Sequence, residues 1–255
     1  MKTFDIQSSA LHLRAAEAPW DSAIFGYPVA QISSIQVLDA AAARADFEPF
    51  WHWCDLHGVR IISCRLAHQQ LRESMLLEQQ QFRFIEMVLH PHLPHLQACT
   101  CDSDSLIIAP AEAEDLPILR GIGAQAFHHE RYHVDPRLDP TFGNQRYARW
   151  VENSLHHPRQ RLLKLLDGQQ IIAFFIIEAS ERGDVYWHLT AVAPAFQGRG
   201  LGRRTWRAMI AHHQNEGLAT ITTTISARNT TVLNLYASLG FRFLPPEMTF
   251  HWVRE

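Results

Sequence analysis

The chain has 255 residues, of which 47% are hydrophobic and 19% charged, so it can bury a substantial core and is not an intrinsically disordered protein. A formal net charge of -3 provides no cationic field for phosphates, so we expect no nucleic acid partner. The sequence shows no signal peptide at its start and no run of about 18 apolar residues, so we expect no membrane partner and a cytoplasmic location.

Cysteine and histidine spacing indicates no metal site. The four cysteines, Cys54, Cys64, Cys99 and Cys101, include no C-x-x-C pair, and the last two are too close for a common zinc site. We interpret all four as reduced thiols. Adjacent histidines such as His128-His129 point to different faces of a helix or strand, so they do not readily share a metal ion. We expect neither a metal nor a disulfide.

The N-terminal half contains one strand–helix–strand unit. Residues 57–66 read as a strand, 71–79 as a helix and 82–85 as the start of a second strand. A polar stretch over 99–105 follows and favours a linker. This linker divides the chain into an N-terminal domain over 1–100 and a C-terminal domain over 106–255.

The C-terminal half alternates helices and strands. Apolar residues recur with helical spacing in two early segments, and Asp167-Gly168 separates two apolar runs in the manner of a hairpin turn. The order indicates an α/β domain with a mixed sheet. The expected elements are helices over 114–127 and 144–155 and strands over 161–166, 171–179 and 185–192.

A second strand–helix–strand unit follows near the C-terminus and matches the first. A β-branched strand over 217–225 leads to an apolar-faced helix over 232–239 and then to a strand from Phe241. Gly217 lies 159 residues after Gly58, and Phe241 lies 159 residues after Phe82 (217 − 58 and 241 − 82). The repeated spacing predicts an internal duplication.

The most specific segment is a glycine-rich loop between a strand and a helix, Gln197-Gly198-Arg199-Gly200-Leu201-Gly202. Glycines allow the backbone to approach a ligand, and the amides at the start of a helix attract anions. Nearby arginines add positive charge, so a diphosphate suits this loop. The spacing fits neither the G-x-G-x-x-G dinucleotide fingerprint nor the Walker loop.

The loop resembles the Q/R-x-x-G-x-G/A signature of GNAT acetyltransferases, and the preceding Val192-Ala193-Pro194 also resembles that family. The resemblance implies a GNAT fold with a mixed, mostly antiparallel central sheet. It implies an N-acetyltransferase that uses acetyl-CoA as co-substrate, with cofactor amides paired to a strand edge. The cofactor-binding residues implied by the resemblance are Leu189, Ala191, Val192, Gln197, Gly198, Arg199, Gly200, Leu201, Gly202 and Arg203.

A second segment, Asn229 to Phe241, resembles the family pattern N-x-x-A-x-x-x-Y-x-x-x-G-F and departs from it at Leu233. The resemblance makes Asn229 a cofactor contact and places Tyr236 beside the thioester sulfur. A phenol there can protonate the departing thiolate. The alternative for Tyr236 is a half-buried core tyrosine.

The first copy of the duplication lacks this chemistry. Gln70 and Leu77 occupy the positions that correspond to Asn229 and Tyr236, and no glycine-rich loop precedes them. The N-terminal half therefore resembles a smaller, degenerate GNAT portion. It can complete the fold, shape the acceptor pocket or support a homodimer.

The acceptor is expected to be a small-molecule amine. The segments Ala126 to Pro136, Arg146 to Asn153 and Trp20 to Gly26 resemble dTDP-fucosamine (dTDP-4-amino-4,6-dideoxygalactose) acetyltransferases, which implies a nucleotide-linked amino sugar. Arg131, Tyr132 and Arg149 are the candidate substrate-binding residues, since arginines grip diphosphates and aromatic rings stack on sugars or bases. Inward-facing aromatic residues beside a solvated arginine face are the alternative.

The general base and the acceptor have several candidates. The amine must lose a proton before it attacks, and His188 is the first candidate, with Glu178, Glu130 or a water chain behind it. A protein N-terminus, a lysine or another small amine are alternative acceptors. A non-catalytic acyl-CoA-binding regulatory module is the alternative from a different class, disfavoured because a sensor needs no proton donor.

Overall fold

The computed structural model describes residues 1–99 and 105–254. The elements of the N-terminal half are β1 (Thr3–Gln7), β2 (Leu11–Glu17), α1 (Pro19–Phe25), β3 (Val29–Val37), α2 (Ala43–Asp46), α3 (Glu48–Leu56), β4 (Ile61–Ala67), α4 (Leu71–Gln79), β5 (Arg83–Leu93) and η1 (Leu96–Ala98). The predicted strand, helix and strand of this half are thus present as β4, α4 and β5. Cys101 and most of the predicted linker lie outside the described residues.

The C-terminal half also has the expected alternation of helices and strands. Its elements are β6 (Ile107–Pro110), η2 (Ala113–Asp115), α5 (Leu116–Gln125), α6 (Arg131–Val134), α7 (Pro140–Ser154), β7 (Arg161–Asp167), β8 (Gln170–Ala179), β9 (Asp184–Val192), η3 (Pro194–Phe196), α8 (Leu201–Asn215), β10 (Thr220–Thr223), β11 (Ile225–Ser226), α9 (Thr230–Ser238) and β12 (Arg242–Val253). The short helix α6, between the two predicted helices, was not foreseen. Among the described residues, no helix is long and apolar enough to cross a membrane.

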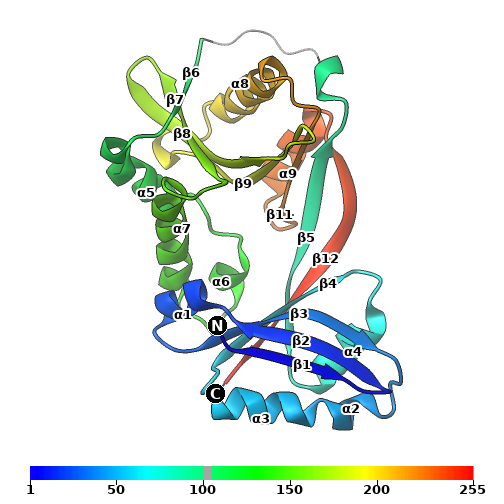
Figure 1. The fold of residues 1–255 in the computed structure, drawn as a ribbon. Coiled ribbons are helices and arrows are strands. Elements are labelled where there is room, and N and C mark those ends of the chain that lie inside the picture. The colour runs from blue at the N-terminus through cyan, green and yellow to red at the C-terminus, as the bar shows by residue number, and fades with distance from the viewer. Residues whose placement is uncertain (100–104, 255) are drawn as a thin grey trace.

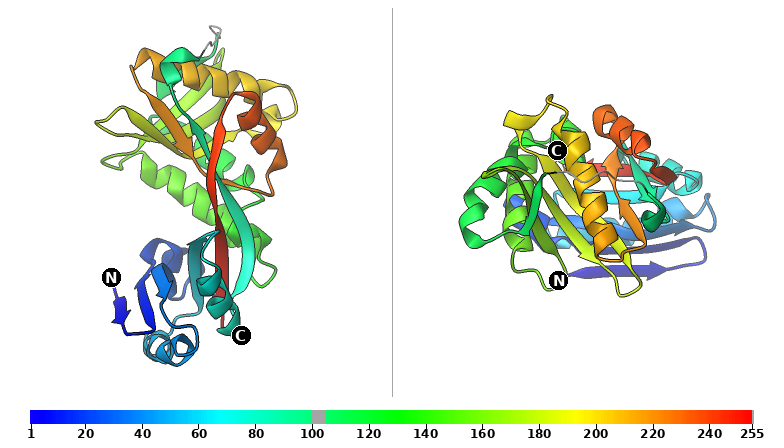
Figure 2. Two further views of the ribbon diagram at one scale, coloured as in Figure 1. Left: turned by 90° about the vertical axis from the view of Figure 1, so that its right-hand side faces the viewer. Right: turned by 90° about the horizontal axis from the view of Figure 1, so that it is seen from above.

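The described strands form one mixed sheet in the order β1-β2-β3-β4-β12-β5-β10-β9-β8-β7-β6, with β11 beside β5. Most neighbours are antiparallel, whereas β3–β4 and β9–β10 are parallel. Figure 1 shows β5 and β12 as long strands that join the two halves, and the side view in Figure 2 shows them crossing from one half to the other. The expected mixed, mostly antiparallel sheet is confirmed.

Alternating side chains explain how the C-terminal sheet carries helices on both faces. Along β8, Phe174 and Ile176 pack with α5 and α7, whereas Phe175 and Ile177 face the core beneath α8 and α9. Successive residues of a strand point to opposite faces, so a continuous apolar run is what a sheet buried on both sides requires. In the N-terminal half, α2, α3 and α4 cover one face of the sheet.

The duplication is visible in the element boundaries and in the strand register. β10, α9 and β12 begin 159 residues after β4, α4 and β5 (220 − 61, 230 − 71 and 242 − 83). Trp252 of β12 lies opposite Ile62 of β4, and its counterpart Leu93 of β5 lies opposite Ile221 of β10. Each copy thus contributes its last strand to the other half of the sheet. The division at residues 100–106 stays a prediction, because the sheet itself continues through both halves.

Candidate active site

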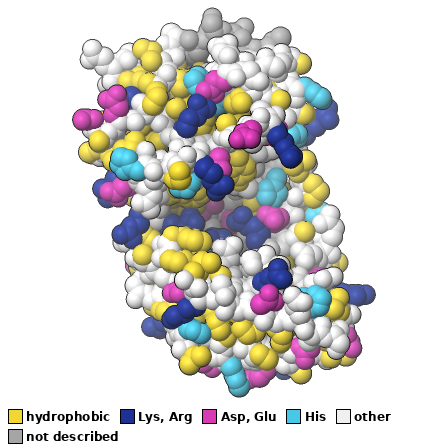
Figure 3. Space-filling view, viewed as in Figure 1, with side chains coloured by type: hydrophobic (Ala, Val, Ile, Leu, Met, Phe, Trp, Pro, Cys, Tyr) yellow, Lys and Arg dark blue, Asp and Glu magenta, His cyan; other side chains and the backbone are white. Residues whose placement is uncertain are grey.

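A cavity of about 1170 Å³ opens between the two halves, and Figure 3 shows the surface hollowed there, with charged side chains around it. The glycine-rich loop and the adjoining ends of α8 and α9 form one end of this cavity. The segment from Ala126 to Tyr132 and α7 form another wall, and Arg65 and Glu86 enter from the N-terminal half. Cavities between packed units are common sites for small ligands.

Strand β9 carries a bulge and an open edge at this cavity. Ile176 pairs with Leu189 and Ile177 with Trp187, so His188 is the extra residue of the bulge. On its other side β9 pairs with β10 only as far as Trp187. Beyond that point no described strand covers the edge of β9. The backbone groups of residues 189–192 that face away from β8 can pair with an amide-bearing ligand, except the Val192 carbonyl, which accepts from Gln197 Nε2.

The glycine-rich loop presents a cradle for an anion. Gly198 has a φ of 73° and Gly200 a φ of 76°, left-handed conformations that favour glycine. Gly200 is the N-cap of the 15-residue α8 and offers no side-chain cap, so the first helical amides stay open for a ligand. A Cβ at Gly200 would meet nothing within 4 Å. The space in front of the loop is therefore open to an anionic ligand.

Some side chains around the loop hold the loop in place, and others line the cavity. Gln197 Nε2 donates to the Val192 carbonyl at 3.0 Å and so fixes the loop against β9. Leu201 is buried in the core, and the Arg199 guanidinium lies 5.9 Å from the Phe196 ring centre. Of the predicted cofactor-binding residues, those that line the cavity are Leu189, Ala191, Val192, Gln197, Gly198, Gly200, Gly202, Arg203, Asn229 and Tyr236.

Tyr236 lines the cavity, and its hydroxyl lies near Thr190 of β9 and Thr223 of β10. Its side chain is buried, and its ring packs against Phe241 at 4.9 Å and Trp206 at 6.2 Å. Burial raises the pKa of the Tyr236 hydroxyl, although the nearby Thr190 hydroxyl acts in the opposite direction. The phenol therefore keeps its proton at neutral pH, as a general acid must.

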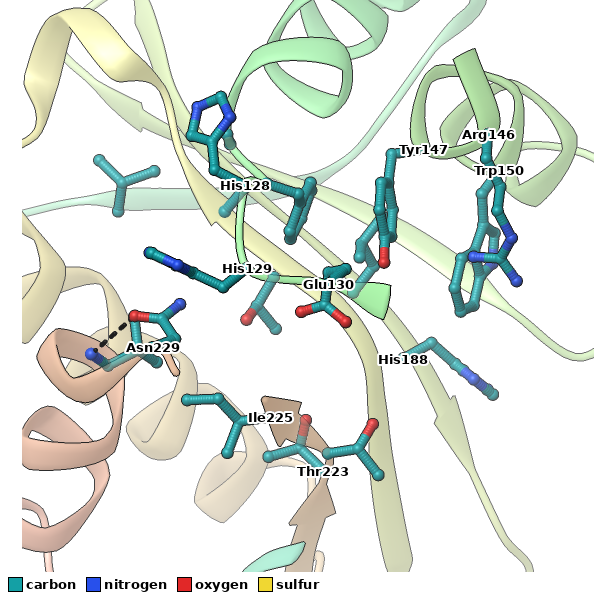
Figure 4. Close-up of a pocket in the computed structure, with 18 of the residues that line it drawn as sticks. His128, His129, Glu130, Arg146, Tyr147, Trp150, His188, Thr223, Ile225 and Asn229 are labelled. Atoms are coloured by element: carbon teal, nitrogen blue, oxygen red, sulfur yellow. Dashed lines mark hydrogen bonds between the residues drawn. The ribbon is translucent and has the colours of Figure 1, made fainter. Parts of the chain in front are cut away.

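Asn229 is the N-cap of α9. Its Oδ1 accepts a hydrogen bond from the Val232 amide at 3.2 Å, as the dashed line in Figure 4 shows. This bond uses the side-chain oxygen, since an asparagine N-cap satisfies one of the unpaired amides of the first turn. The Asn229 amide group faces the cavity with its donors available.

The predicted substrate-binding residues Arg131, Tyr132 and Arg149 all line the cavity, but they differ in their partners. Tyr132 donates to the buried Asp21 carboxylate at 2.8 Å, and Arg131 lies 3.8 Å from the same carboxylate. Arg146 forms the shortest contact to Asp21, at 2.7 Å. Arg149 is exposed and has no ion pair among the described residues, so it is free to meet a ligand.

Sequence reasoning missed the role of Asp21, the acid of the Trp20–Gly26 stretch. Its carboxylate belongs to α1 and holds groups of α6 and α7, so this stretch joins the N-terminal half to the acceptor wall. Burial opposes ionisation of Asp21, but Arg146 and Arg131 outweigh it and lower its pKa. Phe25 supports the joint, with its ring 5.1 Å from that of Tyr132.

His188, the first candidate for the general base, is turned toward Glu178. Its Nε2 lies 3.0 Å from Glu178 Oε2, and its ring packs edge-on against Trp150 at 6.2 Å. Figure 4 shows the His188 ring directed away from Glu130, which points into the middle of the cavity. Of the expected bases, Glu130 is therefore the one nearer the centre of the cavity.

A second carboxylate, Glu86 of β5, faces the cavity beside Glu130. Glu86 is 2% exposed, and neither carboxylate oxygen has a hydrogen-bond partner among the described residues. Burial and the neighbouring Glu130 charge raise the pKa of Glu86 to about 7. No motif marked this residue, because it lies in the half that lacks the glycine-rich loop.

The cysteines and histidines were expected to hold no metal. Cys54, Cys64 and Cys99 are free thiols. His212, His213 and Glu216 lie close enough to share an ion. However, His213 Nε2 accepts from Trp187 Nε1 at 3.0 Å, and its Nδ1 lies 3.0 Å from the Glu216 carboxylate. Both ring nitrogens of His213 are thus used within the protein.

Comparison with known proteins gives the family. Residues 124–241 match the acetyltransferase (GNAT) family. The [ribosomal protein bS18]-alanine N-acetyltransferase of Salmonella typhimurium is 30% identical over 112 residues, which cover 44% of this chain and 68% of that protein. The chain belongs to the GNAT family of N-acetyltransferases. Enzymes of this family use acetyl-CoA, which fits the loop and the open edge of β9.

Other similar proteins differ in how much they cover. The spore coat polysaccharide biosynthesis protein SpsD of Bacillus subtilis is 19% identical over 224 residues, 87% of this GNAT chain and 76% of SpsD. The mycothiol acetyltransferase of Renibacterium salmoninarum is 44% identical over 59 residues, 23% of the chain, which spans only 17% of that protein. A tandem GNAT protein from the clavulanic acid biosynthesis pathway shares the fold, with a TM-score of 0.62 at 12% identity over 98% of this chain and 82% of that one.

Proposed function

We propose that this protein transfers the acetyl group of acetyl-CoA to a primary amine bound in the cavity between its two halves. The observation that carries the proposal is the meeting of three features in one cavity: the glycine-rich loop, the open edge of β9 and the phenol of Tyr236. A binding module needs the first two features alone. The buried, protonated Tyr236 adds a group that can serve as the general acid in turnover.

The cofactor has a defined place in this proposal. The amides at the start of α8 and the Arg203 side chain hold the pyrophosphate, and the backbone from Leu189 to Val192 pairs with the pantetheine amides. The Asn229 side-chain amide donates to the same ligand. This arrangement brings the thioester to Tyr236, which protonates the departing sulfur.

The acceptor that we propose first is a nucleotide-linked amino sugar. Arg149 is exposed at the cavity and forms no ion pair with any other described residue, and Trp20, Trp150 and Tyr186 line the cavity with aromatic rings. The similarity to SpsD, a polysaccharide biosynthesis protein, extends over both halves of the chain. Because Arg131 and Arg146 share the Asp21 carboxylate, Arg149 is the main candidate for a phosphate contact.

A peptide N-terminus is the second candidate acceptor. It is favoured by the similarity to the bS18-alanine N-acetyltransferases, 28% identical in Escherichia coli over 135 residues and 52% of this chain. That similarity covers about half of the chain, whereas the cavity also uses side chains of the N-terminal half. A peptide acceptor would leave Trp20 and Arg65 without an evident role.

An assay of thiol release from acetyl-CoA distinguishes these acceptors. The panel contains dTDP-4-amino-4,6-dideoxygalactose, the same amino sugar without its nucleotide, and a peptide with an N-terminal alanine. We expect the nucleotide sugar to react with the highest kcat/KM. An equal kcat/KM for the free sugar or the peptide would refute the acceptor, and no thiol release with any amine would refute the transferase.

A further inference from the structure

The N-terminal half places an unusual charged group in the cavity. Glu86 is almost completely buried, yet neither of its carboxylate oxygens has a hydrogen-bond partner among the described residues. The Ser226 hydroxyl is nearby but lies outside hydrogen-bonding geometry. Burying an unpaired carboxylate opposes folding, so a site that keeps one needs another reason for it.

The surroundings of Glu86 show which ligand suits it. Glu130, from the segment before α6, also lines the cavity and raises the pKa of Glu86, whereas Arg131 of α6 and Arg65 of β4 lower it. Among the described residues neither arginine forms an ion pair with Glu86: Arg131 lies 3.8 Å from Asp21, and Arg65 Nε lies 3.9 Å from Glu247. Two carboxylates around an open space attract a cation, and the acceptor supplies one as its ammonium group.

Glu86 also lies close to where the thioester is expected. It belongs to β5, which pairs with β11 at Val88 and Leu89, directly after the end of β10. The gap between β9 and β10 is where the cofactor edge opens, and Thr223 and Ile225 line the cavity there (Figure 4). An ammonium between Glu86 and Glu130 would therefore lie beside the gap that receives acetyl-CoA.

We propose that Glu86, contributed by the half that lacks the cofactor loop, binds the ammonium of the acceptor together with Glu130 and serves as the general base. This proposal rests on the proposed acetyltransferase function. In this proposal both copies of the duplication contribute to one active site. The first copy provides the proton acceptor Glu86, and the second provides the cofactor loop and Tyr236. A pKa of Glu86 near neutrality suits a base that works at neutral pH.

The reaction balances with these two protein groups. The Glu86 carboxylate takes one proton from the bound ammonium, and the freed nitrogen lone pair forms a bond to the thioester carbonyl carbon. The carbon–sulfur bond breaks, and the sulfur takes the proton of the Tyr236 hydroxyl. The nitrogen, now part of the amide, returns its surplus proton to the Tyr236 oxygen. The products are the acetylated amine, CoA thiol and one proton, which leaves from Glu86.

The test compares Glu86→Gln with wild type on the amines that wild type acetylates. Glutamine keeps the size of the side chain but takes no proton, so kcat should fall about 100-fold or more, while the Kd of acetyl-CoA stays unchanged. Glu86→Asp should recover part of the loss. Wild-type kcat/KM should rise as the pH passes about 7, and this rise should be absent in Glu86→Gln.

Glu73→Gln is the matched control. Glu73 is a buried carboxylate of the same half, and its Oε1 accepts from the Val37 amide at 2.8 Å, a bond that glutamine can keep. It does not line the cavity, so this variant should retain wild-type kcat and KM. A comparable loss in Glu73→Gln would show that the effect of Glu86→Gln is one of folding.

A stability measurement separates a base from a structural group. Because the pKa of Glu86 is raised in the folded protein, its contribution to folding is present below its ordinary value of 4.5 and is lost as the pH rises through about 7. Glu86→Gln should therefore reduce the fall in Tm between pH 5 and pH 8. A variant with a larger fall would mean that the charged carboxylate stabilises the fold.

Three further results would also overturn the proposal. Glu86→Gln could keep kcat/KM within threefold of wild type, or it could lose acetyl-CoA binding as well. In carbon-13 NMR of protein with labelled glutamate, the signal that is missing in Glu86→Gln belongs to Glu86. This signal could titrate near 4.5, a result that can be obtained even if no acceptor is found. Failure of wild type on every amine would instead refute the proposed function, and the base with it.

Discussion

The carboxylate of Asp21 offers a sharp test of how the two halves are joined. It is 1% exposed and contacts Arg146 at 2.7 Å, Arg131 at 3.8 Å and the Tyr132 hydroxyl at 2.8 Å. Asp21→Asn keeps the shape but removes the carboxylate that pairs with two mostly buried guanidiniums. Removing one partner of a buried ion pair costs about 3–5 kcal/mol. For a chain of this size we expect Tm to fall by roughly 6–20 °C.

The assay is thermal and urea unfolding, with Asp5→Asn as the control. Asp5 forms an exposed ion pair with Arg14 at 2.9 Å, and such pairs contribute less than about 1 kcal/mol. Since the pKa of Asp21 is lowered, its contribution is present above 3.8, its ordinary value, and is lost as the pH falls below that. A loss in Asp21→Asn no larger than that in Asp5→Asn would refute the reasoning.

Three further predictions concern the cavity. Gly200→Val, at a φ of 76°, should abolish acetyl-CoA binding in calorimetry. The control Gly168→Val, in the β7–β8 turn at a φ of 61° and with equally open space, should still bind. Unchanged binding by folded Gly200→Val would contradict the loop assignment. Tyr236→Phe should keep acetyl-CoA affinity and lower kcat by about 10²–10⁴-fold, so a loss under about threefold removes Tyr236 as the general acid. Arg149→Ala should raise KM for the nucleotide sugar but not for the free sugar, since the lost contact is to phosphate; an equal rise for both would exclude that contact.

Local sequence patterns were sufficient for the elements and for the cofactor end of the site. Apolar runs identified the strands on either side of Asp167-Gly168. Successive residues of a strand point to opposite faces of the sheet, so a continuous apolar run indicates a strand that is buried on both faces. The Gln197–Gly202 segment indicated the anion cradle, because Gly198 and Gly200 need a left-handed backbone that other residues rarely adopt. The 159-residue offset predicted a duplication, whose strand register the structure then showed.

The acceptor end depended on contacts between distant residues. Asp21 and Arg146 are 125 positions apart, and Asp21 and Tyr132 are 111 apart, so no local pattern could tell that Arg131 and Arg146 share a buried acid. Glu86 was missed for the same reason. It faces the cavity only because β5 crosses to pair with β10 and β12. The chain encodes each element through nearby residues, whereas the exchange of strands between its two halves decides which charges meet in the cavity.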